Sequence, residues 1–460
     1  MAGIGFVLRK LSKQDNLLGT VQAYMISALV STGPWLFTIL ALGSINALSG
    51  RFGSQAVLVE FRTVIIYNFA FSLVLTAPIY MVVTRYLADS IYHQDVSGTP
   101  GLLIGSLILL YIIELPLACF FYLGYANLSL GLALSAIVNF LLISAVWLVS
   151  IFLTALKNYR TVTQAFGFGM LVTVISAGFL IGSFGSIGIL NSFSLGLSVI
   201  LALLFARILS EYPYPFQKPF AFLSYFTKYW EIAVSGFVYN VAIWVDKWIM
   251  WFSPNADMPA SGLITYADYD SAMFLAYLTV VPSMAMFIMS VETHFYERYL
   301  KFYRDIQQMA TFQQIQQNWK EIVLSILRSS RGLMVLQGSI CVIVILISSR
   351  IFDLLQINYM QLGIFRFGVL ATMFQVFSLF ILIILSYFDH RKATLLIQLI
   401  FLVTNVAFTL LSIKLGFKYY GYGYFLASLV TFLAAALITM QYVNKLVYHT
   451  FITRNSSVSG

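Results

Sequence analysis

Charged side chains are scarce in this sequence of 460 residues, and their scarcity excludes a water-soluble protein. Asp, Glu, Lys and Arg make up 9% of the residues, hydrophobic residues make up 60%, and the mean hydropathy is +0.89. Because soluble domains carry about 25% charged residues, this chain cannot cover a whole surface that faces water. The composition predicts a multi-pass membrane protein in contact with membrane lipids.

The sequence also has only two cysteines and none of the common catalytic motifs. The two cysteines, Cys119 and Cys341, lie in separate apolar runs, which excludes a disulfide framework and a CxxC metal site. The sequence contains no Walker A phosphate loop, no HExxH and no GxSxG. It therefore predicts no enzyme, no cofactor and no metal site, and leaves transport or scaffolding as functions.

Basic residues outnumber acidic ones, 26 to 17, giving a net charge of +9. Such an excess can indicate a nucleic-acid partner, but these residues lie mostly in short loops between apolar runs, as do residues that orient helices in a bilayer. The sequence therefore predicts no nucleic-acid partner. The distribution favours cytoplasmic N- and C-termini, which requires an even number of spans.

Apolar runs long enough to cross a membrane recur along the whole chain. A helix needs about 20 apolar residues to cross a hydrocarbon core roughly 30 Å thick. Twelve runs meet this requirement, which predicts an all-α integral membrane protein. They are 22–48, 63–84, 101–124, 129–156, 162–184, 187–209, 229–252, 271–291, 332–349, 363–386, 393–413 and 421–443.

Similar features recur in the two halves of the chain and predict two six-helix bundles. The stretches SALVSTGPW (27–35) and IAVSGFVYN (232–240) interrupt the first helix of each half with small and polar residues. Repeated halves around a central substrate path are common in transporters. The predicted parts are an interfacial cytoplasmic helix (1–17), a first bundle (18–210), a cytoplasmic linker (211–228), a second bundle (229–445) with a cytoplasmic amphipathic segment (295–330), and a tail (446–460).

The segment 295–330 carries apolar residues at spacings of three, four and seven, interleaved with Gln and basic residues. This pattern predicts one amphipathic helix or a pair of helices. The apolar face either packs at the membrane interface or forms a docking surface for a cytoplasmic partner.

Ionisable residues inside apolar runs are candidate functional residues, because a charge at mid-bilayer costs about 2.5–3.5 kcal/mol on insertion scales. Glu114 lies halfway along the third run, and Pro116 leaves a backbone carbonyl one turn earlier without its helical donor. Glu114 is either a proton-binding site or part of a buried hydrogen bond between helices. Glu231, at the start of the seventh run, either faces a hydrated passage or lies at the headgroups.

Two adjacent charges, Asp246 and Lys247, lie in the seventh run within IWVDKWIMWFSP (243–254). Adjacent side chains on a helix do not face each other, so we predict no mutual ion pair and a partner for each on another helix or in a hydrated cavity. Tyr239 and Asn240, seven residues earlier, extend these charges into two polar stripes. The stripes indicate either the wall of a wet passage or a structural contact.

Aromatic residues make up 16% of the chain, and many are expected in interfacial belts. Trp248, beside the polar stripes, either belongs to such a belt or stacks on the face of a sugar.

Several blocks of the sequence resemble the PelG family, the membrane exporters of bacterial Pel exopolysaccharide systems. They include MAGIGFVLRKL at the start, STGPWLFTILAL in the first run, VVTRYLADSIY after the second, VDKWIMWFSP in the seventh, ETHFYERYLKFY after the eighth and YYGYGYFLASLV leading into the last. The resemblance places Asp246, Lys247 and Arg85 on family-like motifs without assigning a role to any of them.

The resemblance implies a fold of the MOP flippase superfamily, with twelve helices in two six-helix bundles in the bacterial cytoplasmic (inner) membrane. It also implies an N-acetylhexosamine-rich polysaccharide as cargo. The partners that it implies are a PelF-like cytoplasmic glycosyltransferase and PelD- and PelE-like membrane subunits.

Three functions agree with the sequence. The first is export of a nascent polysaccharide between the two bundles. The second is an ion-coupled multidrug antiporter similar to the MATE family, although such antiporters commonly use an acid in the first span and residues 16–50 contain none. The third is a scaffold of the synthase complex that transports nothing.

Overall fold

The computed structural model describes residues 32–48, 55–155, 159–257, 261–355 and 357–453. Within these ranges the chain is helical and forms no strand, only an isolated bridge between Asp257 and Thr265. The predicted all-α fold is thus confirmed for the described residues. The predicted interfacial helix 1–17 lies outside them.

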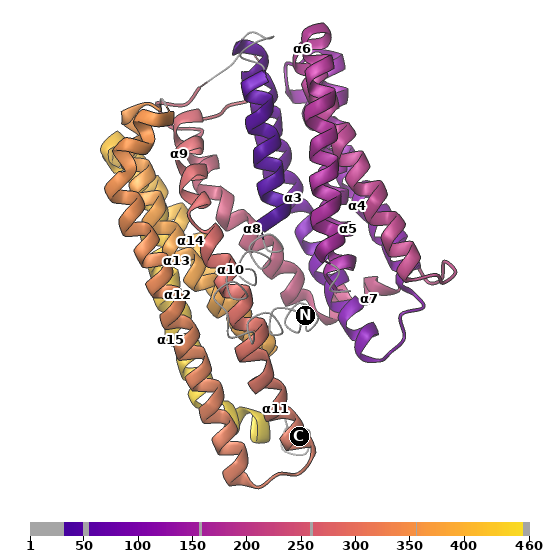
Figure 1. Ribbon diagram of the computed structural model, residues 1–460, viewed down its shortest axis with the longest axis vertical. Helices are drawn as coiled ribbons and strands as arrows, with labels where there is room; N and C mark the ends of the chain where they lie inside the picture. Colours follow the sequence, from indigo (N-terminus) through magenta and orange to yellow (C-terminus); the bar gives the residue numbers. More distant parts are fainter. Residues whose placement is uncertain (1–31, 49–54, 156–158, 258–260, 356, 454–460) are drawn as a thin grey trace, which may run out of the picture. The chain divides into compact units, whose positions relative to one another are not determined.

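Helices follow one another along the described chain with short connections (Figure 1). In the first half they are Thr32–Leu48, α3 (Gln55–Tyr92), α4 (Thr99–Cys119), η1 (Phe120–Tyr125), α5 (Leu130–Ala155), α6 (Tyr159–Glu211), η2 (Ala221–Leu223), α7 (Ser224–Lys228) and α8 (Trp230–Met250). In the second half they are α9 (Ala267–Leu278), α10 (Val281–Met289), η3 (Ser290–Phe295), α11 (Tyr296–Gln307), α12 (Phe312–Leu355), η4 (Tyr359–Gln361), α13 (Leu362–Tyr387), α14 (Arg391–Leu415), η5 (Phe417–Tyr419), α15 (Tyr422–Asn444), α16 (Leu446–Tyr448) and η6 (His449–Thr453).

Nine helices of the described residues are long and apolar enough to cross a membrane, and a shorter apolar helix spans Thr32–Leu48. This number makes the chain a multi-pass membrane protein. The count of twelve spans and their grouping into two six-helix bundles stay predictions.

The helix α6 is a hairpin of two arms. Its 53 residues include Gly185 with φ 55° and ψ −130°, a conformation that essentially only glycine adopts. On either side the arms pack closely, because a Cβ on Gly169 would lie 2.7 Å from the Gly196 carbonyl oxygen. The predicted break between the runs 162–184 and 187–209 is therefore confirmed at Gly185.

Contacts divide the chain into two compact units. One consists of Thr32–Trp244 and Trp251–Ala267 and is called here the N-terminal unit. The other contains Val245–Met250 and Asp268–Gly460 and is called the C-terminal unit. The boundary between them falls inside α8, near its end.

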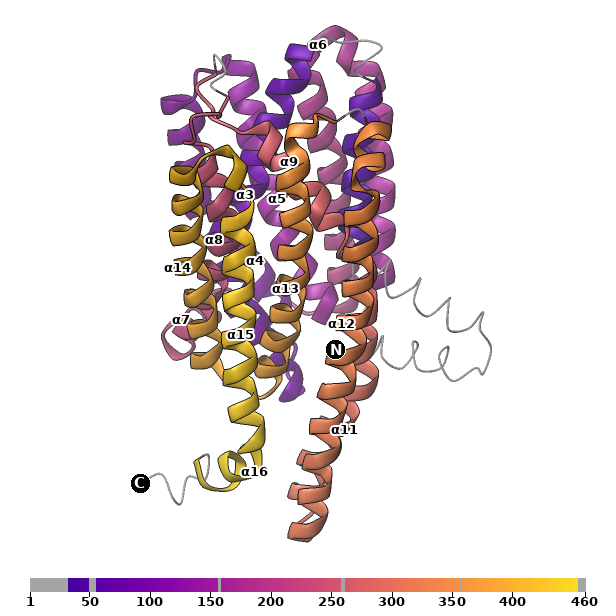
Figure 2. The same ribbon diagram turned by 90° about the vertical axis from the view of Figure 1, so that its left-hand side faces the viewer.

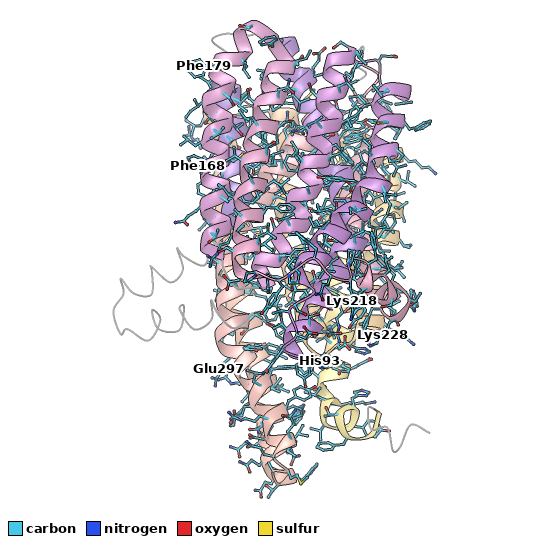
Figure 3. All side chains as sticks on the ribbon, turned by 90° about the vertical axis from the view of Figure 1, so that its right-hand side faces the viewer. His93, Phe168, Phe179, Lys218, Lys228 and Glu297 are labelled. Carbon is cyan, nitrogen blue, oxygen red and sulfur yellow. The ribbon has the colours of Figure 1, made fainter. Side chains whose placement is uncertain are left out.

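In the N-terminal unit, α5 packs against α3, α4 and α6 (Figure 1). The proline-rich segment that follows α6 packs on the start of α4, since a Cβ on Gly101 would lie 1.9 Å from the Gln217 carbonyl oxygen. Figure 3 shows His93, Lys218 and Lys228 at the same end of this unit. The polar connections therefore gather at one end of the helices.

The outer surface of α6 is apolar. Phe168 and Phe179 project outward from it (Figure 3), and their side chains are 56% and 79% exposed. Large apolar side chains exposed along a long helix are expected where the helix faces lipid.

In the C-terminal unit, α15 packs against α13 and α14, and α12 packs against α13. Figure 2 shows α12 continuing past the ends of α13 and α15 to pair with α11. In this pair, Asn318 donates to Asp305 at 2.8 Å, Lys301 lies 3.3 Å from Glu321, and Phe302 is fully buried. The predicted amphipathic segment therefore forms a pair of helices, the second of which is continuous with a membrane-crossing helix.

Candidate functional site

The last turn of α8 carries the adjacent charges predicted as a candidate site. Asp246 is fully buried, and the Lys247 ammonium Nζ lies 3.3 Å from both of its carboxylate oxygens. The prediction that these two residues form no mutual ion pair was wrong. Their Cβ atoms point about 100° apart, but the four methylenes of lysine let the ammonium turn back to the preceding carboxylate.

Two other helices of the C-terminal unit complete this cluster. The Tyr269 hydroxyl of α9 donates to Asp246 Oδ2 at 3.0 Å. The Lys247 Nζ lies 5.4 Å from the ring centroids of both Tyr277 of α9 and Tyr424 of α15, and the hydroxyls of these two tyrosines share a hydrogen bond. The predicted partners on other helices are therefore confirmed, and we call these five residues the paired-charge cluster.

The paired-charge cluster carries no net charge, because the ammonium neutralises the carboxylate. Each ring face adds about 0.5–2 kcal/mol of attraction for a cation. Removing one member of a buried pair leaves an uncompensated charge, which costs far more than removing both. The arrangement is a fixed, neutral, hydrogen-bonding group that includes three tyrosine hydroxyls.

The residues of α8 that precede this cluster belong to the N-terminal unit. Asn240 is buried, donates to the Gly236 carbonyl at 2.8 Å and forms a hydrogen bond with the Tyr80 hydroxyl of α3. Tyr239 is half-buried. The predicted role of these residues as a wall of a wet passage stays a prediction.

Glu231 and Trp248 lie at opposite ends of α8, in its first and last turns, and both are half-buried. With 1.5 Å of rise per residue, Glu231 lies about 22 Å along the helix axis from Asp246. The structure therefore does not bring Glu231 into the paired-charge cluster.

Glu114 lies in the interior of the N-terminal unit. Its side chain is 0% exposed, and Oε1 accepts a hydrogen bond from the Thr76 hydroxyl at 3.0 Å. The Ser144 hydroxyl of α5 is a further neighbour of the carboxyl group. Among the described residues, Oε2 has no hydrogen-bond partner.

A chain of buried hydrogen bonds crosses the same unit. Tyr122 donates to Asn68 Oδ1 at 2.6 Å, Asn68 donates to Asn139 Oδ1 at 2.9 Å, and Asn139 donates to Ser194 Oγ at 3.0 Å. These residues come from η1, α3, α5 and α6. A buried network with satisfied members fixes the packing of the helices that contribute to it.

Sequence reasoning missed the polar stripe of α3 that supplies these contacts. Its members are Asn68, Ser72, Thr76, Tyr80 and Thr84. Residues four apart are neighbours on a helix surface, so this spacing in an apolar run was a readable signal. The stripe is fully buried at Asn68, Ser72 and Thr76, half-buried at Tyr80 and exposed at Thr84.

Arg85 lies one residue beyond the stripe, beside the ring of Tyr229. Its Nε lies 3.2 Å from Asp89 Oδ1, and its guanidinium carbon lies 4.8 Å from the ring centroid of Tyr229. The ammonium of Lys228 lies 5.1 Å from the same ring. Burial and the Asp89 carboxylate raise the pKa of the nearby Tyr225 hydroxyl. This basic and aromatic cluster ties α3 to α7 and the start of α8.

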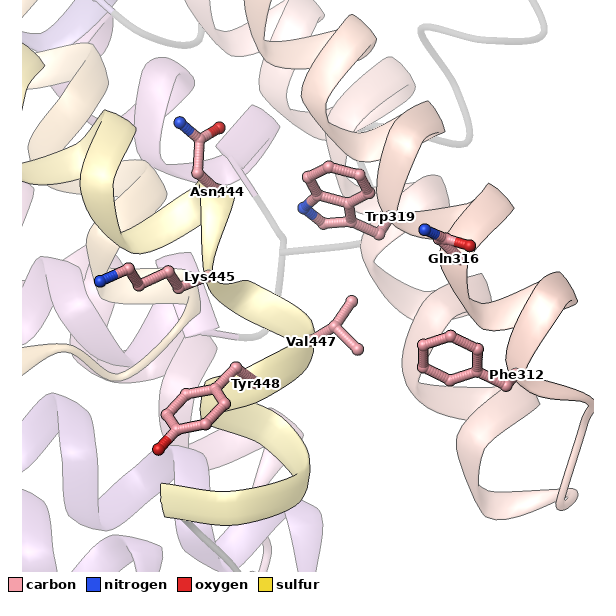
Figure 4. A pocket seen from close by; sticks show the side chains of 7 residues that line it. All are labelled: Phe312, Gln316, Trp319, Asn444, Lys445, Val447 and Tyr448. Carbon is pink, nitrogen blue, oxygen red and sulfur yellow. The ribbon is translucent and has the colours of Figure 1, made fainter.

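A pocket opens where α12 passes the end of α15, in the part of the C-terminal unit that projects beyond the bundle (Figure 4). Its volume is about 530 Å³. Trp319 Nε1 donates to the Val443 carbonyl at 2.8 Å, which fixes the indole ring in the wall. The lining residues are Phe312, Gln316, Trp319, Asn444, Lys445, Val447 and Tyr448.

The sequence profile of the PelG family, described as "Putative exopolysaccharide Exporter (EPS-E)", matches residues 1–451. The chain belongs to the PelG family. The resemblance stated from the sequence is thereby confirmed. No curated protein matches the chain.

Solved transporters share the fold of this PelG-family protein. A MOP superfamily transporter from Pyrococcus furiosus has a TM-score of 0.66 and 13% identity, over 92% of this chain and 96% of that one. A multidrug resistance MATE family transporter in an outward-facing conformation gives 0.67 and 14%, over 93% and 96%. A multidrug resistance MATE family transporter in an inward-facing conformation gives 0.62 and 14%, over 96% and 99%.

At these identities the solved structures show the fold alone, which is that of MOP superfamily transporters. Family and fold together make the chain a membrane transport protein of an exporter family. Neither is a family or fold of enzymes.

Proposed function

We propose that this PelG-family protein exports a nascent Pel-type exopolysaccharide, rich in N-acetylhexosamine, across the bacterial cytoplasmic membrane. The observation that carries the proposal is the match to an exopolysaccharide exporter family over residues 1–451. The protein would hold twelve spans in two six-helix bundles, with both termini in the cytoplasm. It would work with a PelF-like glycosyltransferase and PelD- and PelE-like membrane subunits.

The chemistry of the paired-charge cluster supports a neutral, hydroxyl-rich cargo. Asp246 and Lys247 cancel each other's charge, and tyrosine hydroxyls surround them. A neutral polymer gains nothing from the membrane potential, which acts with about 2.3 kcal/mol per elementary charge per 100 mV. We place the cluster on the export route, with Tyr239, Asn240 and Trp248 along the same helix.

The second candidate is an ion-coupled multidrug antiporter, favoured by the similarity to MATE transporters. Against it stands the pairing of Asp246 with Lys247, because a carboxylate already neutralised by an ammonium attracts a cationic drug weakly. A scaffold that transports nothing is the third candidate.

Complementation tests these alternatives. A polymer-secreting host that lacks this gene receives the wild-type gene or an empty vector, and secreted and cell-associated polymer are measured with a lectin specific for N-acetylhexosamine. Export predicts that only the wild type restores secreted polymer. Restored drug resistance without restored polymer would instead favour the antiporter.

The double variant Asp246→Asn, Lys247→Gln separates transport from scaffolding. Export predicts lost secretion while the partner subunits still co-purify with the variant. Full secretion by this variant would remove the paired-charge cluster from the route.

A further inference from the structure

Two acidic side chains of the described residues are fully buried, Glu114 and Asp246. Glu114 differs from Asp246 because it has no basic partner among the described residues. Asp246 has the Lys247 ammonium at 3.3 Å. Glu114 is also 0% exposed, but its neighbours are the hydroxyls of Thr76 and Ser144. Its surroundings therefore supply hydrogen bonds and no positive charge.

Such a site holds the neutral, protonated form of a carboxyl group. An ionised carboxylate taken out of water without a counter-charge is strongly disfavoured, and the group neutralises instead. Oε1 accepts from Thr76, and Oε2, which has no hydrogen-bond partner among the described residues, is free to carry the proton. The titratable groups around it are Tyr111 on α4 and, one turn along from Thr76, Tyr80 on α3.

The polar stripe of α3 connects this buried site to an exposed end. From Thr76 the stripe continues through the half-buried Tyr80, which is bonded to Asn240, to the exposed Thr84. Side chains four residues apart on a helix lie about 6 Å apart, a gap that one water molecule can bridge. The stripe therefore places polar side chains at one-turn intervals between Glu114 and the exposed Thr84.

The backbone around Glu114 is also suited to movement. Pro116, inside α4, removes the hydrogen bond that the Ile112 carbonyl would otherwise accept. Four residues later α4 ends in the π-helical turn η1, a geometry often found at functional sites. A change of charge on Glu114 thus acts on a stretch of helix with fewer regular backbone hydrogen bonds.

We propose that Glu114 is a proton-binding site, filled through the α3 stripe, and that uptake and release of its proton switch the packing of α4 on α3 and so couple transport to a proton gradient. Deprotonation places an uncompensated charge between α3, α4 and α5, so the helices separate or admit water until the proton returns. The coupling to export rests on the proposed function, whereas proton binding does not.

Infrared spectroscopy of the purified full-length protein in detergent tests proton binding directly. We expect a carboxylic-acid C=O band that weakens as the pH rises and that is missing from Glu114→Gln. A band that is the same at every pH, or that remains in Glu114→Gln, overturns the proposal.

Complementation tests the coupling. Glu114→Gln, which mimics the permanently protonated form, should insert and unfold like the wild type but secrete no more polymer than a host with an empty vector. Glu114→Asp, which keeps a titratable group, should restore part of the secretion. The matched control is Tyr122→Phe, which removes a buried hydroxyl in the adjoining turn η1 and should secrete almost normally.

The outcomes separate the two proposals. Wild-type secretion by Glu114→Gln, or an equal loss in Tyr122→Phe, overturns the coupling. A wild-type gene that restores no polymer overturns the proposed function and leaves the infrared result standing.

Discussion

At the scale of single residues, Lys247 shows how a cation is kept inside an apolar helix bundle. Its ammonium has a carboxylate at 3.3 Å and two tyrosine rings at 5.4 Å. None of these partners is strong enough by itself to replace water. Together they satisfy the charge, and each depends on the others being present.

Replacing Lys247 alone should therefore destabilise the protein strongly. We expect Lys247→Met to lower the free energy of unfolding by about 3–5 kcal/mol, because Asp246 stays behind as an unpaired buried charge. The double variant Asp246→Asn, Lys247→Met should lower the free energy of unfolding much less, because no unpaired charge remains. Thermal unfolding in detergent measures both.

Lys228→Met is the matched control for this experiment, since Lys228 also lies over tyrosine rings but is exposed. Its loss should cost less than about 1 kcal/mol. Equal effects at the two lysines would show that Lys247 is hydrated rather than buried.

At the scale of helices, the apolar runs were predicted well because a helix that crosses lipid needs about 20 consecutive apolar residues, which are easily recognised in a sequence. Each run within the described residues is helical, including the two arms of α6 on either side of Gly185. The eighth run is two helices, α9 and α10, and the second begins beside Pro282. That break depends on one proline within an otherwise continuous apolar run.

The turn of α6 gives a prediction at this scale. Gly185→Ala should destabilise the protein by about 1–3 kcal/mol, since residues with a Cβ rarely adopt φ 55° with ψ −130°. Gly182→Ala, three residues earlier in open space, should be neutral or stabilise by up to about 1 kcal/mol. Thermal unfolding of the two variants compares them, and similar values would mean that the turn is not strained.

The hydrogen bond between α12 and α15 gives another prediction at this scale. Trp319→Phe keeps the ring but loses the donor to the Val443 carbonyl, which should cost about 0.5–1.5 kcal/mol. Hydrogen exchange should speed up at the end of α15 and remain unchanged in α13. Phe312→Leu, on the same helix and 66% exposed, serves as the control and should change neither.

At the scale of the whole molecule, the sequence predicted the class and family but not the internal contacts. Periodicity tells which face of a helix is polar, but not which other helix that face meets. The bond from Asn68 to Asn139 joins positions 71 residues apart, and nothing in either local stretch specifies the other. The Asp246 and Lys247 pair was missed for a different reason, because helix geometry fixes Cβ directions and leaves long side chains free to bend.

The proposed orientation can be tested with single cysteines in a background without Cys119 and Cys341. Met309→Cys and Met360→Cys lie near the two ends of α12, at positions 92% and 66% exposed. An impermeant thiol reagent added to intact cells should label Met360→Cys, and Met309→Cys only after lysis. Labelling of Met309→Cys in intact cells would invert the topology.

The unbroken length of α12 has a mechanical consequence. Its 44 residues contain no interior proline and extend over about 66 Å. Membrane helices lean by about 20° on average, and a swing of that size about the midpoint would carry each tip through roughly 10 Å. A change in the tilt of α12 within the membrane would therefore displace the wall of the aromatic pocket at its far end.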